Sequence, residues 1–158
     1  MAVWQIPSPK GLDMATRRAT PRTTEHARLL GLAPSGLTEL LRQVEEGFPY
    51  RLLENFHEAV HLPMCEIGHL VRIPARTLHR RKKEGMLQPE ESDRLLRASR
   101  VFRRALDLFE DDLGAAKRWL STPQPALGGL EPLEMARTDL GAQEVERLIG
   151  QLEHGVFP

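Results

Sequence analysis

The feature that most constrains this chain is the spacing of its apolar residues, which recur every three or four positions from residue 35 to residue 152. Leu52, Leu53, Phe56 and Val60 form one such set. This period places apolar side chains on one face of an α-helix, and no segment shows the convincing alternation of a strand. The sequence therefore predicts an all-α fold, with helices near 35–47, 49–62, 64–71, 74–84 and 89–110 and shorter ones toward the C-terminus.

The composition is that of a globular protein kept in a reducing compartment. Of the 158 residues, 41% are hydrophobic, enough for one domain with a core or for two small domains that share an interface. Residues 1–24, rich in Pro, Thr and Arg, predict a flexible tail and contain no secretory signal. Cys65 is the only cysteine, and no apolar run has the length of a membrane span. We therefore expect a cytoplasmic protein without a membrane partner.

Charge is distributed unevenly along the chain although its net value is zero. Residues 71–104 hold eleven Lys and Arg against four Asp and Glu, whereas residues 105–158 hold four basic and ten acidic residues. A basic block is typical of a phosphate-binding surface, and an acidic end indicates a different partner. The alternative is that both blocks are solvated helix faces.

The segment 64–85, MCEIGHLVRIPARTLHRRKKEG, has the pattern of a helix-turn-helix. Ile67, Leu70 and Val71 are predicted to fill the inner face of the first helix. Gly68 would let the second helix cross closely, and Leu78 would anchor that helix. The pattern predicts a second helix able to enter the major groove of DNA.

The outer face of this second helix supplies the candidate DNA-binding residues. They are Arg76, Thr77, His79, Arg80, Lys82 and Lys83. Arginine can bind guanine through two hydrogen bonds, and Arg81 with the two lysines would suit phosphates. Arg72 departs from the pattern, because many such motifs have glycine in the turn. A basic amphipathic hairpin with no groove role is the alternative.

His57-Glu58-Ala59-Val60-His61 matches the H-E-x-x-H string of zinc metalloproteases. A catalytic zinc needs a third protein ligand, and the nearest suitable residues, Glu66, His69 and His79, all lie in the predicted helix-turn-helix. Pro63 would also end the helix soon after the second histidine. We therefore expect ordinary helix residues here, no metal site and no catalytic residue, with a zinc hydrolase as the competing hypothesis.

The C-terminal segment carries the most specific pattern in the chain. Its residues are Trp119-Leu120, Pro123, Ala126-Leu127-Gly128-Gly129, Pro132-Leu133-Glu134, Thr138, Gly141-Ala142, Val145 and Glu153-His154-Gly155-Val156-Phe157. On these residues, the segment 119–158 resembles the toxin-binding domain of Xre/MbcA/ParS-type antitoxins. The segment upstream resembles the Xre-like DNA-binding half of the same family, so the resemblance covers roughly residues 35–158.

The resemblance implies an antitoxin rather than an enzyme. Such antitoxins pair with RES-domain toxins, which have an ADP-ribosyltransferase-like fold and consume NAD, and they cover the entrance of the toxin's active site. The cofactor belongs to the toxin, so the chain itself needs none. The helix-turn-helix half is expected to bind promoter DNA and repress its own operon, as a homodimer.

We divide the chain accordingly into the tail, a helix-turn-helix and dimerisation region at 25–110, and a toxin-binding domain at 111–158. The candidate toxin-binding residues are Arg137, Leu152, Glu153, His154, Gly155, Val156, Phe157 and Pro158. We expect Trp119 in the core rather than at an interface. The competing hypothesis is a dimeric DNA-binding transcriptional regulator without a toxin partner, whose C-terminal domain only dimerises.

Overall fold

The structure, a computed structural model, describes residues 22–33 and 35–156. Its helices are η1 (Arg22–Leu30), α1 (Leu37–Glu46), α2 (Arg51–Val60), α3 (Met64–Leu70), α4 (Ala75–Glu84), α5 (Pro89–Leu108), α6 (Leu113–Leu120), η2 (Pro125–Leu127), α7 (Pro132–Met135) and α8 (Asp139–Glu153). Within the described residues there is no strand, only two isolated β-bridges, so the predicted all-α fold is confirmed.

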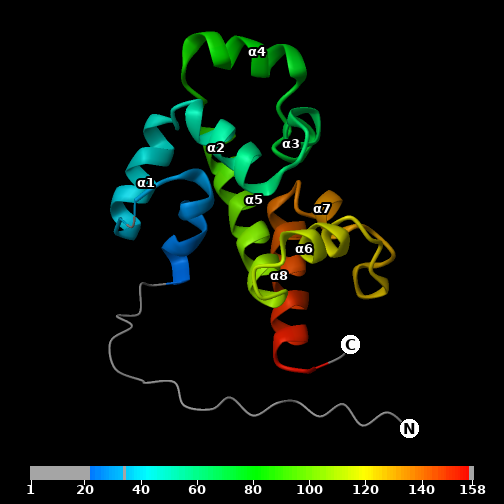
Figure 1. Cartoon of the computed structure of the whole chain (residues 1–158). Coiled ribbons are helices and arrows are strands. Elements are labelled where there is room, and N and C mark those ends of the chain that lie inside the picture. Colours follow the sequence, from blue (N-terminus) through cyan, green and yellow to red (C-terminus); the bar gives the residue numbers. More distant parts are fainter. Residues whose placement is uncertain (1–21, 34, 157–158) are drawn as a thin grey trace, which may run out of the picture.

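The long helix α5 runs through the centre of the molecule, and η1, α1, α2, α6 and α8 all pack on it (Figure 1). Its buried residues Phe102 and Ala105 belong to a hydrophobic core that also includes Phe56 of α2 and Ile149 of α8. The rings of Phe56 and Phe102 meet edge to face with centroids 5.4 Å apart, a favourable geometry for an aromatic pair. One core therefore joins the N-terminal and C-terminal segments.

Local sequence explains where α5 begins and ends. Pro89 occupies its first turn, where a missing N–H is tolerated, and the backbone N–H of Gln88 donates to Glu91 at 2.8 Å. The helix ends at Leu108 because Glu110 and Asp111 have φ of 53° and 66°, which α-helical backbone does not allow. The predicted end at 110 is therefore two residues late.

The C-terminal helices are held by side-chain caps and close packing. The hydroxyl of Thr138 accepts from the Gly141 N–H at 3.0 Å and begins α8, and the Asp112 carboxylate caps α6 in the same way through Ala115. A Cβ on Gly141 would collide with the Met135 carbonyl, so only glycine lets α8 approach α7 this closely. The close contact at Gly141 thus sets how near α8 packs to α7.

The described part of the chain begins with η1, and α1 follows it. Residues 1–21 of the expected tail lie outside the described residues, whereas residues 22–24 already belong to η1. Helix α1 begins at Leu37 with Gly36 at its N-cap.

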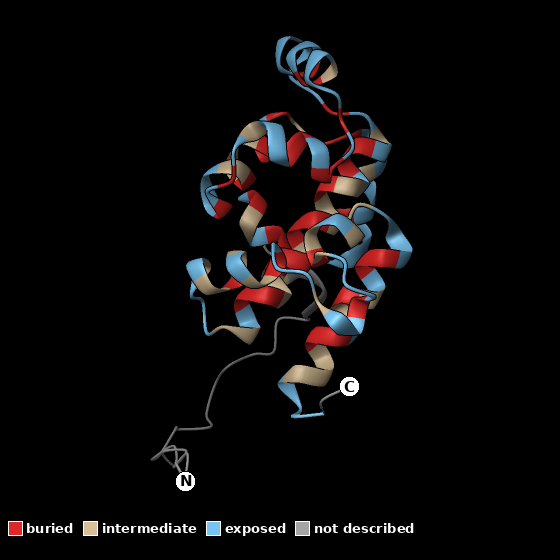
Figure 2. Cartoon of the chain, turned by 90° about the vertical axis from the view of Figure 1, so that its right-hand side faces the viewer, coloured by how far each residue is buried: buried red, intermediate tan, exposed pale blue. Residues whose placement is uncertain are grey.

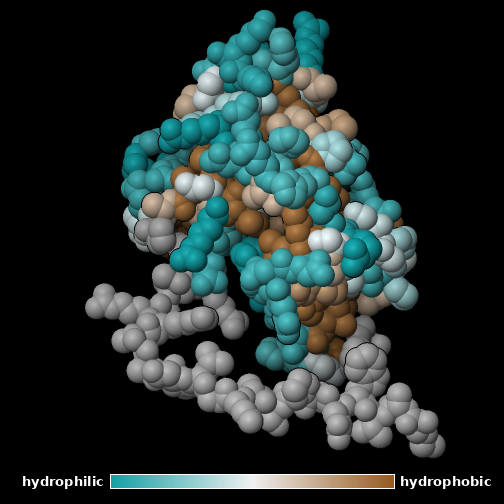
Figure 3. Space-filling view, in the orientation of Figure 1, coloured by the Kyte–Doolittle hydropathy of each residue, from teal (hydrophilic) through white to brown (hydrophobic). Residues whose placement is uncertain are grey.

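Helix α4 stands at one end of the molecule, away from the buried centre. In Figure 2 it is mostly exposed, while the middle of α5 is buried. Hydrophilic side chains cover this end in the space-filling view of Figure 3. The fold thus presents the most basic helix to solvent.

Candidate functional site

Helices α3 and α4 pack as the sequence predicts. Ile67, Leu70 and Val71 are buried on the inner face of α3, and Leu78 anchors α4. A Cβ on Gly68 would lie 2.8 Å from the Leu78 side chain, too close for any larger residue without a shift. The predicted helix-turn-helix packing is therefore confirmed in its inner residues.

The turn between α3 and α4 places Arg72 where many such motifs have glycine. Arg72 has φ of 56°, so it adopts the left-handed conformation itself. Its N–H donates to the His69 carbonyl at 3.2 Å, and the Ile73 N–H donates to the Gly68 carbonyl at 2.8 Å. These bonds close the end of α3 in the manner of a glycine-terminated helix. Arginine in the turn thus preserves the motif's geometry.

The candidate DNA-binding residues of α4 differ in their exposure and in whether their side chains pair with other residues of the chain. Arg76, His79 and Lys83 are exposed and make no ion pair or hydrogen bond through their side chains to other residues that the structure describes. Arg80 is exposed and lies 3.8 Å from Glu84. These four form the outward face of α4, which we call the basic face.

The two remaining candidates lie at the edges of the basic face. Thr77 is half-buried. Lys82 points toward α2, where its ammonium lies 3.4 Å from the Glu54 carboxylate, and it remains 65% exposed. An exposed pair of this kind is weak, so Lys82 stays available to phosphates.

Arg81 does not have the expected role of a phosphate contact. Its side chain is only 10% exposed, and its guanidinium donates to Glu91 of α5 and to Glu84, both at 2.8 Å. Burial alone would raise the pKa of Glu91, but the hydrogen bonds from Arg81 and from the Gln88 N–H outweigh it and lower that pKa. Arg81 therefore fastens α4 to α5.

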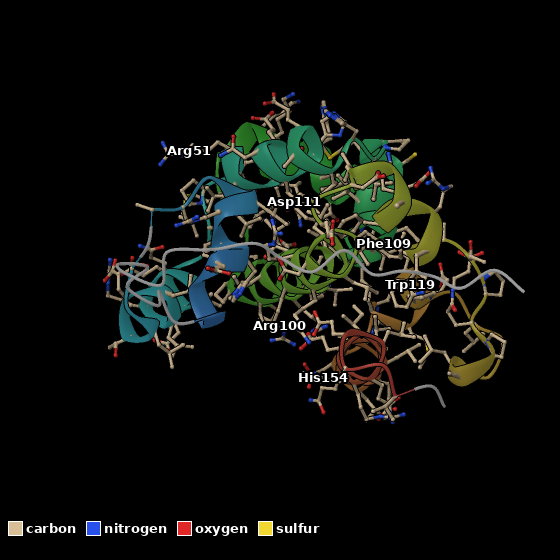
Figure 4. The ribbon with its side chains drawn as sticks, turned by 60° about the horizontal axis from the view of Figure 1, so that its bottom comes forward. Arg51, Arg100, Phe109, Asp111, Trp119 and His154 are labelled. Atoms are coloured by element: carbon tan, nitrogen blue, oxygen red, sulfur yellow. The ribbon has the colours of Figure 1, made fainter. Side chains whose placement is uncertain are left out.

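The arginines of α5 are also neutralised within the molecule. Three ion pairs join α5 to α8 or to its first turn: Arg97 with Asp139 at 3.4 Å, Arg100 with Glu146 at 2.5 Å, and Arg104 with Glu153 at 3.1 Å. Figure 4 shows Arg100 on the side of α5 that faces α8. Arg103 likewise binds Asp107 and Asp111. Four of the five α5 arginines thus bind carboxylates of this chain, and Arg94 binds backbone carbonyls, which leaves the basic face of α4 as the better surface for phosphates.

The candidate toxin-binding residues lie at two places. Arg137 follows α7 and donates to the His69 carbonyl and to Glu134, at 3.1 Å each. Glu153 ends α8 and binds Arg104. The structure therefore does not bring Arg137 together with the end of the chain.

The last described residues project from the end of α8. Leu152 is half-buried, and His154, which Figure 4 places at the end of the helix, is exposed. Gly155 has φ of 68°, where glycine is favoured, and Val156 is 57% exposed. Phe157 and Pro158 lie outside the described residues. In Figure 3, apolar atoms reach the surface beside the lower part of α8.

Sequence reasoning missed two exposed apolar residues in the same half. Leu140, in the first turn of α8, is 72% exposed, and Leu130, between η2 and α7, is 56% exposed. Only Leu140 had a signal in the helical pattern, because it falls outside the buried stripe of α8 formed by Ala142, Val145 and Ile149. Trp119, by contrast, packs against the core and lies 6.4 Å from the Phe109 ring.

The H-E-x-x-H string, residues 57–61, lies at the C-terminal end of α2. Helix α2 stops at Val60, and His61 has the left-handed conformation with φ of 49°, so the two histidines do not continue along one helix. The His57 ring N–H donates to the Leu62 carbonyl at 2.6 Å. Among the residues that the structure describes, no group of three His, Cys, Asp or Glu side chains has metal-binding geometry.

No helix in the described part of the chain is long and apolar enough to cross a bilayer.

The fold and the basic face define a helix-turn-helix protein with a second helical domain packed on its long helix. A family model described as the antitoxin Xre-like helix-turn-helix domain matches residues 39–100. A second, described as the antitoxin Xre/MbcA/ParS C-terminal toxin-binding domain, matches residues 104–155. The chain belongs to the Xre antitoxin family, which is not a family of enzymes.

Individual relatives agree with this assignment. The chain is 41% identical to an antitoxin Xre of Yersinia enterocolitica, over 91% of this chain and 99% of the relative. It is 34% identical to an antitoxin Xre of Pseudomonas putida, over 74% and 72%. A Prs ADP-ribosylating antitoxin of a Sphingobium strain is 24% identical, over 92% and 98%. The predicted family is therefore confirmed.

Proposed function

We propose that this chain neutralises a RES-type, NAD-consuming toxin by placing its C-terminal residues in the toxin's active-site entrance. The observation that carries the proposal is the end of α8, where an exposed segment with an apolar residue, Val156, leaves the domain after Gly155. Clefts that bind small molecules are concave and largely apolar, so a short projecting segment can fill one. The printed name of the Sphingobium relative, which contains "ADP-ribosylating antitoxin", supports a toxin of this chemistry.

The contact surface comprises the end of α8 and the residues that follow it. We assign toxin contacts to Leu152, Glu153, His154, Gly155, Val156, Phe157 and Pro158. The ion pair of Glu153 with Arg104 supports this role, because it holds the last turn of α8 against α5 and fixes the direction of the following residues.

The same protein is proposed to repress its own operon as a homodimer. Helix-turn-helix proteins commonly bind as dimers to half-sites about one turn of DNA apart. The basic face of α4 is exposed, its one ion pair to a described residue is the exposed contact of Arg80 with Glu84, and α4 stands at one end of the molecule, which suits insertion into the major groove. DNA binding would be strongly salt-dependent, since several cations lie on this one helix.

The decisive experiment is co-expression with the product of the neighbouring reading frame, which the proposal expects to be a RES-domain toxin. A variant that stops after His154 keeps α8 and the Glu153 bond intact, and we expect it to lose protection of cells and of cellular NAD. His57→Ala, in α2, is the matched control and should protect as well as the full chain. Full protection by the shortened variant would contradict the proposed contact.

A further inference from the structure

We propose that Arg137, in the toxin-binding domain, is a positioning residue for the turn of the helix-turn-helix. The proposal rests on the proposed function in one respect, that α4 reads DNA. It gives Arg137 a role inside the molecule in place of the toxin contact expected from sequence. The C-terminal domain would then help to hold the DNA-reading helices in shape.

The turn needs external support because of its conformation. Arg72 has φ of 56°, a region that is unfavourable for a residue with a long side chain. Such conformations persist where the surrounding structure over-determines them. The carbonyl groups at the end of α3 also carry the negative end of the helix dipole.

Two guanidinium groups from outside the motif bind these carbonyl groups. Arg94 of α5 donates to the carbonyls of Val71 and Arg72, at 3.2 and 3.0 Å. Arg137 donates to the carbonyl of His69 at 3.1 Å. Arg72, Arg94 and Arg137 line one surface hollow, which lies between the turn, the start of α5 and the start of α8. The turn is thus held from two sides.

Arg137 is itself held in place. Its guanidinium binds one oxygen of Glu134 at 3.1 Å, and the other oxygen of Glu134 accepts from the His69 ring at 2.6 Å. Burial would raise the pKa of Glu134, yet its bonds to His69 and Arg137 lower it. Glu134 of α7 therefore contacts the side chain of His69, and Arg137, just after α7, contacts its backbone.

The contacts of Glu134 and Arg137 with His69 form the polar connection between the helix-turn-helix and the C-terminal domain. Among the described residues, the side-chain hydrogen bonds between segments 64–85 and 121–156 come only from Glu134 and Arg137. Arg137 directly precedes Thr138, the N-cap of α8, so a displacement of α8 displaces the guanidinium. A ligand that shifts α8 would thereby change the turn, and DNA binding would change ligand affinity by the same factor.

The test is hydrogen exchange of the full-length protein, measured by mass spectrometry on peptides that cover residues 69–73. The Ile73 N–H, which bonds to the Gly68 carbonyl, reports opening of the turn. Arg137→Ala should accelerate its exchange by about tenfold or more, as expected for loss of one hydrogen bond to a charged group. Arg147→Ala is the matched control, because Arg147 is exposed on α8 and, among the described residues, its side chain binds only Glu144. Unchanged exchange in Arg137→Ala, or equal acceleration in Arg147→Ala, overturns the proposal.

A second variant tests whether faster exchange comes from strain in the turn or from destabilisation of the whole protein. Arg72→Gly adopts positive φ without strain, so adding it to Arg137→Ala should restore slow exchange of Ile73. Continued fast exchange in the double variant would count against the proposal.

Binding measurements distinguish this role from the proposed function. Arg137→Ala should weaken promoter retention several-fold together with the faster exchange. Weaker binding of the RES-domain toxin without any change in exchange would make Arg137 a toxin contact and overturn the positioning role. Should the unaltered chain bind neither DNA nor toxin, the proposed function fails, while the exchange data still decide the role of Arg137.

Discussion

Neighbouring arginines of α4 have opposite roles although their side chains are chemically identical. Arg80 is exposed on the basic face, whereas Arg81 is buried and bound to Glu91 of α5. A buried pair gives little net stability compared with apolar packing, but losing one partner leaves an uncompensated charge in the interior. Loss of either Arg81 or Glu91 is therefore expected to destabilise the protein, whereas Arg80, whose ion pair with Glu84 is exposed and weak, stays available to a ligand.

Replacing Glu91 by Gln should destabilise the protein at pH 7 by about 3 kcal/mol, because Arg81 would lose its buried counter-charge. The lowered pKa of Glu91 means that its stabilisation is present above the usual value near 4.5 and is lost as pH falls through the lowered pKa. The difference between wild type and Glu91→Gln should thus shrink when urea unfolding is repeated at about pH 3.5.

Glu90→Gln removes a charge from the exposed neighbouring position and serves as the control. It should leave the unfolding free energy within about 0.5 kcal/mol of wild type. An equal loss in both variants, or a Glu91 effect that does not depend on pH, would contradict the assigned pair.

Whether the sequence predicts the role of such a residue depends on how far along the chain its partner lies. The burial of Arg81 had a local signal, because it lies one helical turn after Leu78 on the same face. Arg137 had none, since its acceptor is a backbone carbonyl 68 residues earlier. Contacts of that separation arise only from tertiary packing.

At the scale of elements, the spacing of apolar residues identified nearly every α-helix, and local backbone chemistry explains the small errors in where the helices begin and end. Proline and glycine positions located α2 to α4 to within two residues. The arginines of α5 were open to two interpretations, phosphate contact or solvated face. Neither interpretation includes their observed bonds, because the acids that bind Arg100 and Arg104 belong to α8, more than 40 residues later.

The basic face of α4 predicts a specific loss of DNA affinity. Arg76→Ala combined with Arg80→Ala should weaken promoter binding on the order of 100-fold, at about 1–3 kcal/mol for each specific contact. Because the two arginines are assigned to base edges rather than to phosphates, the slope of log affinity against log salt should change little. Fluorescence anisotropy with labelled promoter DNA, at several salt concentrations, measures both quantities.

Arg118→Ala is the matched control for this loss, because Arg118 is exposed on α6, in the domain that follows α5. It removes one charge but should leave affinity within about twofold, since it lies outside the helix-turn-helix. Equal losses in the two proteins would mean that only overall charge matters and that α4 does not enter the groove.

On the scale of the whole molecule, the two family domains share α5. The matched segments end at residue 100 and begin again at residue 104, both inside this unbroken helix. The core extends from Leu30 to Ile149, and three ion pairs tie α5 to the α8 segment. The basic middle and the acidic end of the chain therefore partly neutralise each other within the fold.

A shared core predicts that both domains unfold together. Trp119 reports on the C-terminal domain, and Trp4→Phe removes the only other tryptophan. In that variant, at a fixed protein concentration, the urea midpoints from Trp119 fluorescence and from far-UV circular dichroism should coincide. An earlier fluorescence midpoint would show that the C-terminal domain unfolds first, because circular dichroism follows all the helices. Two separate transitions would then mean that α5 remains folded without α8, and that contacts across α5 do not couple the domains.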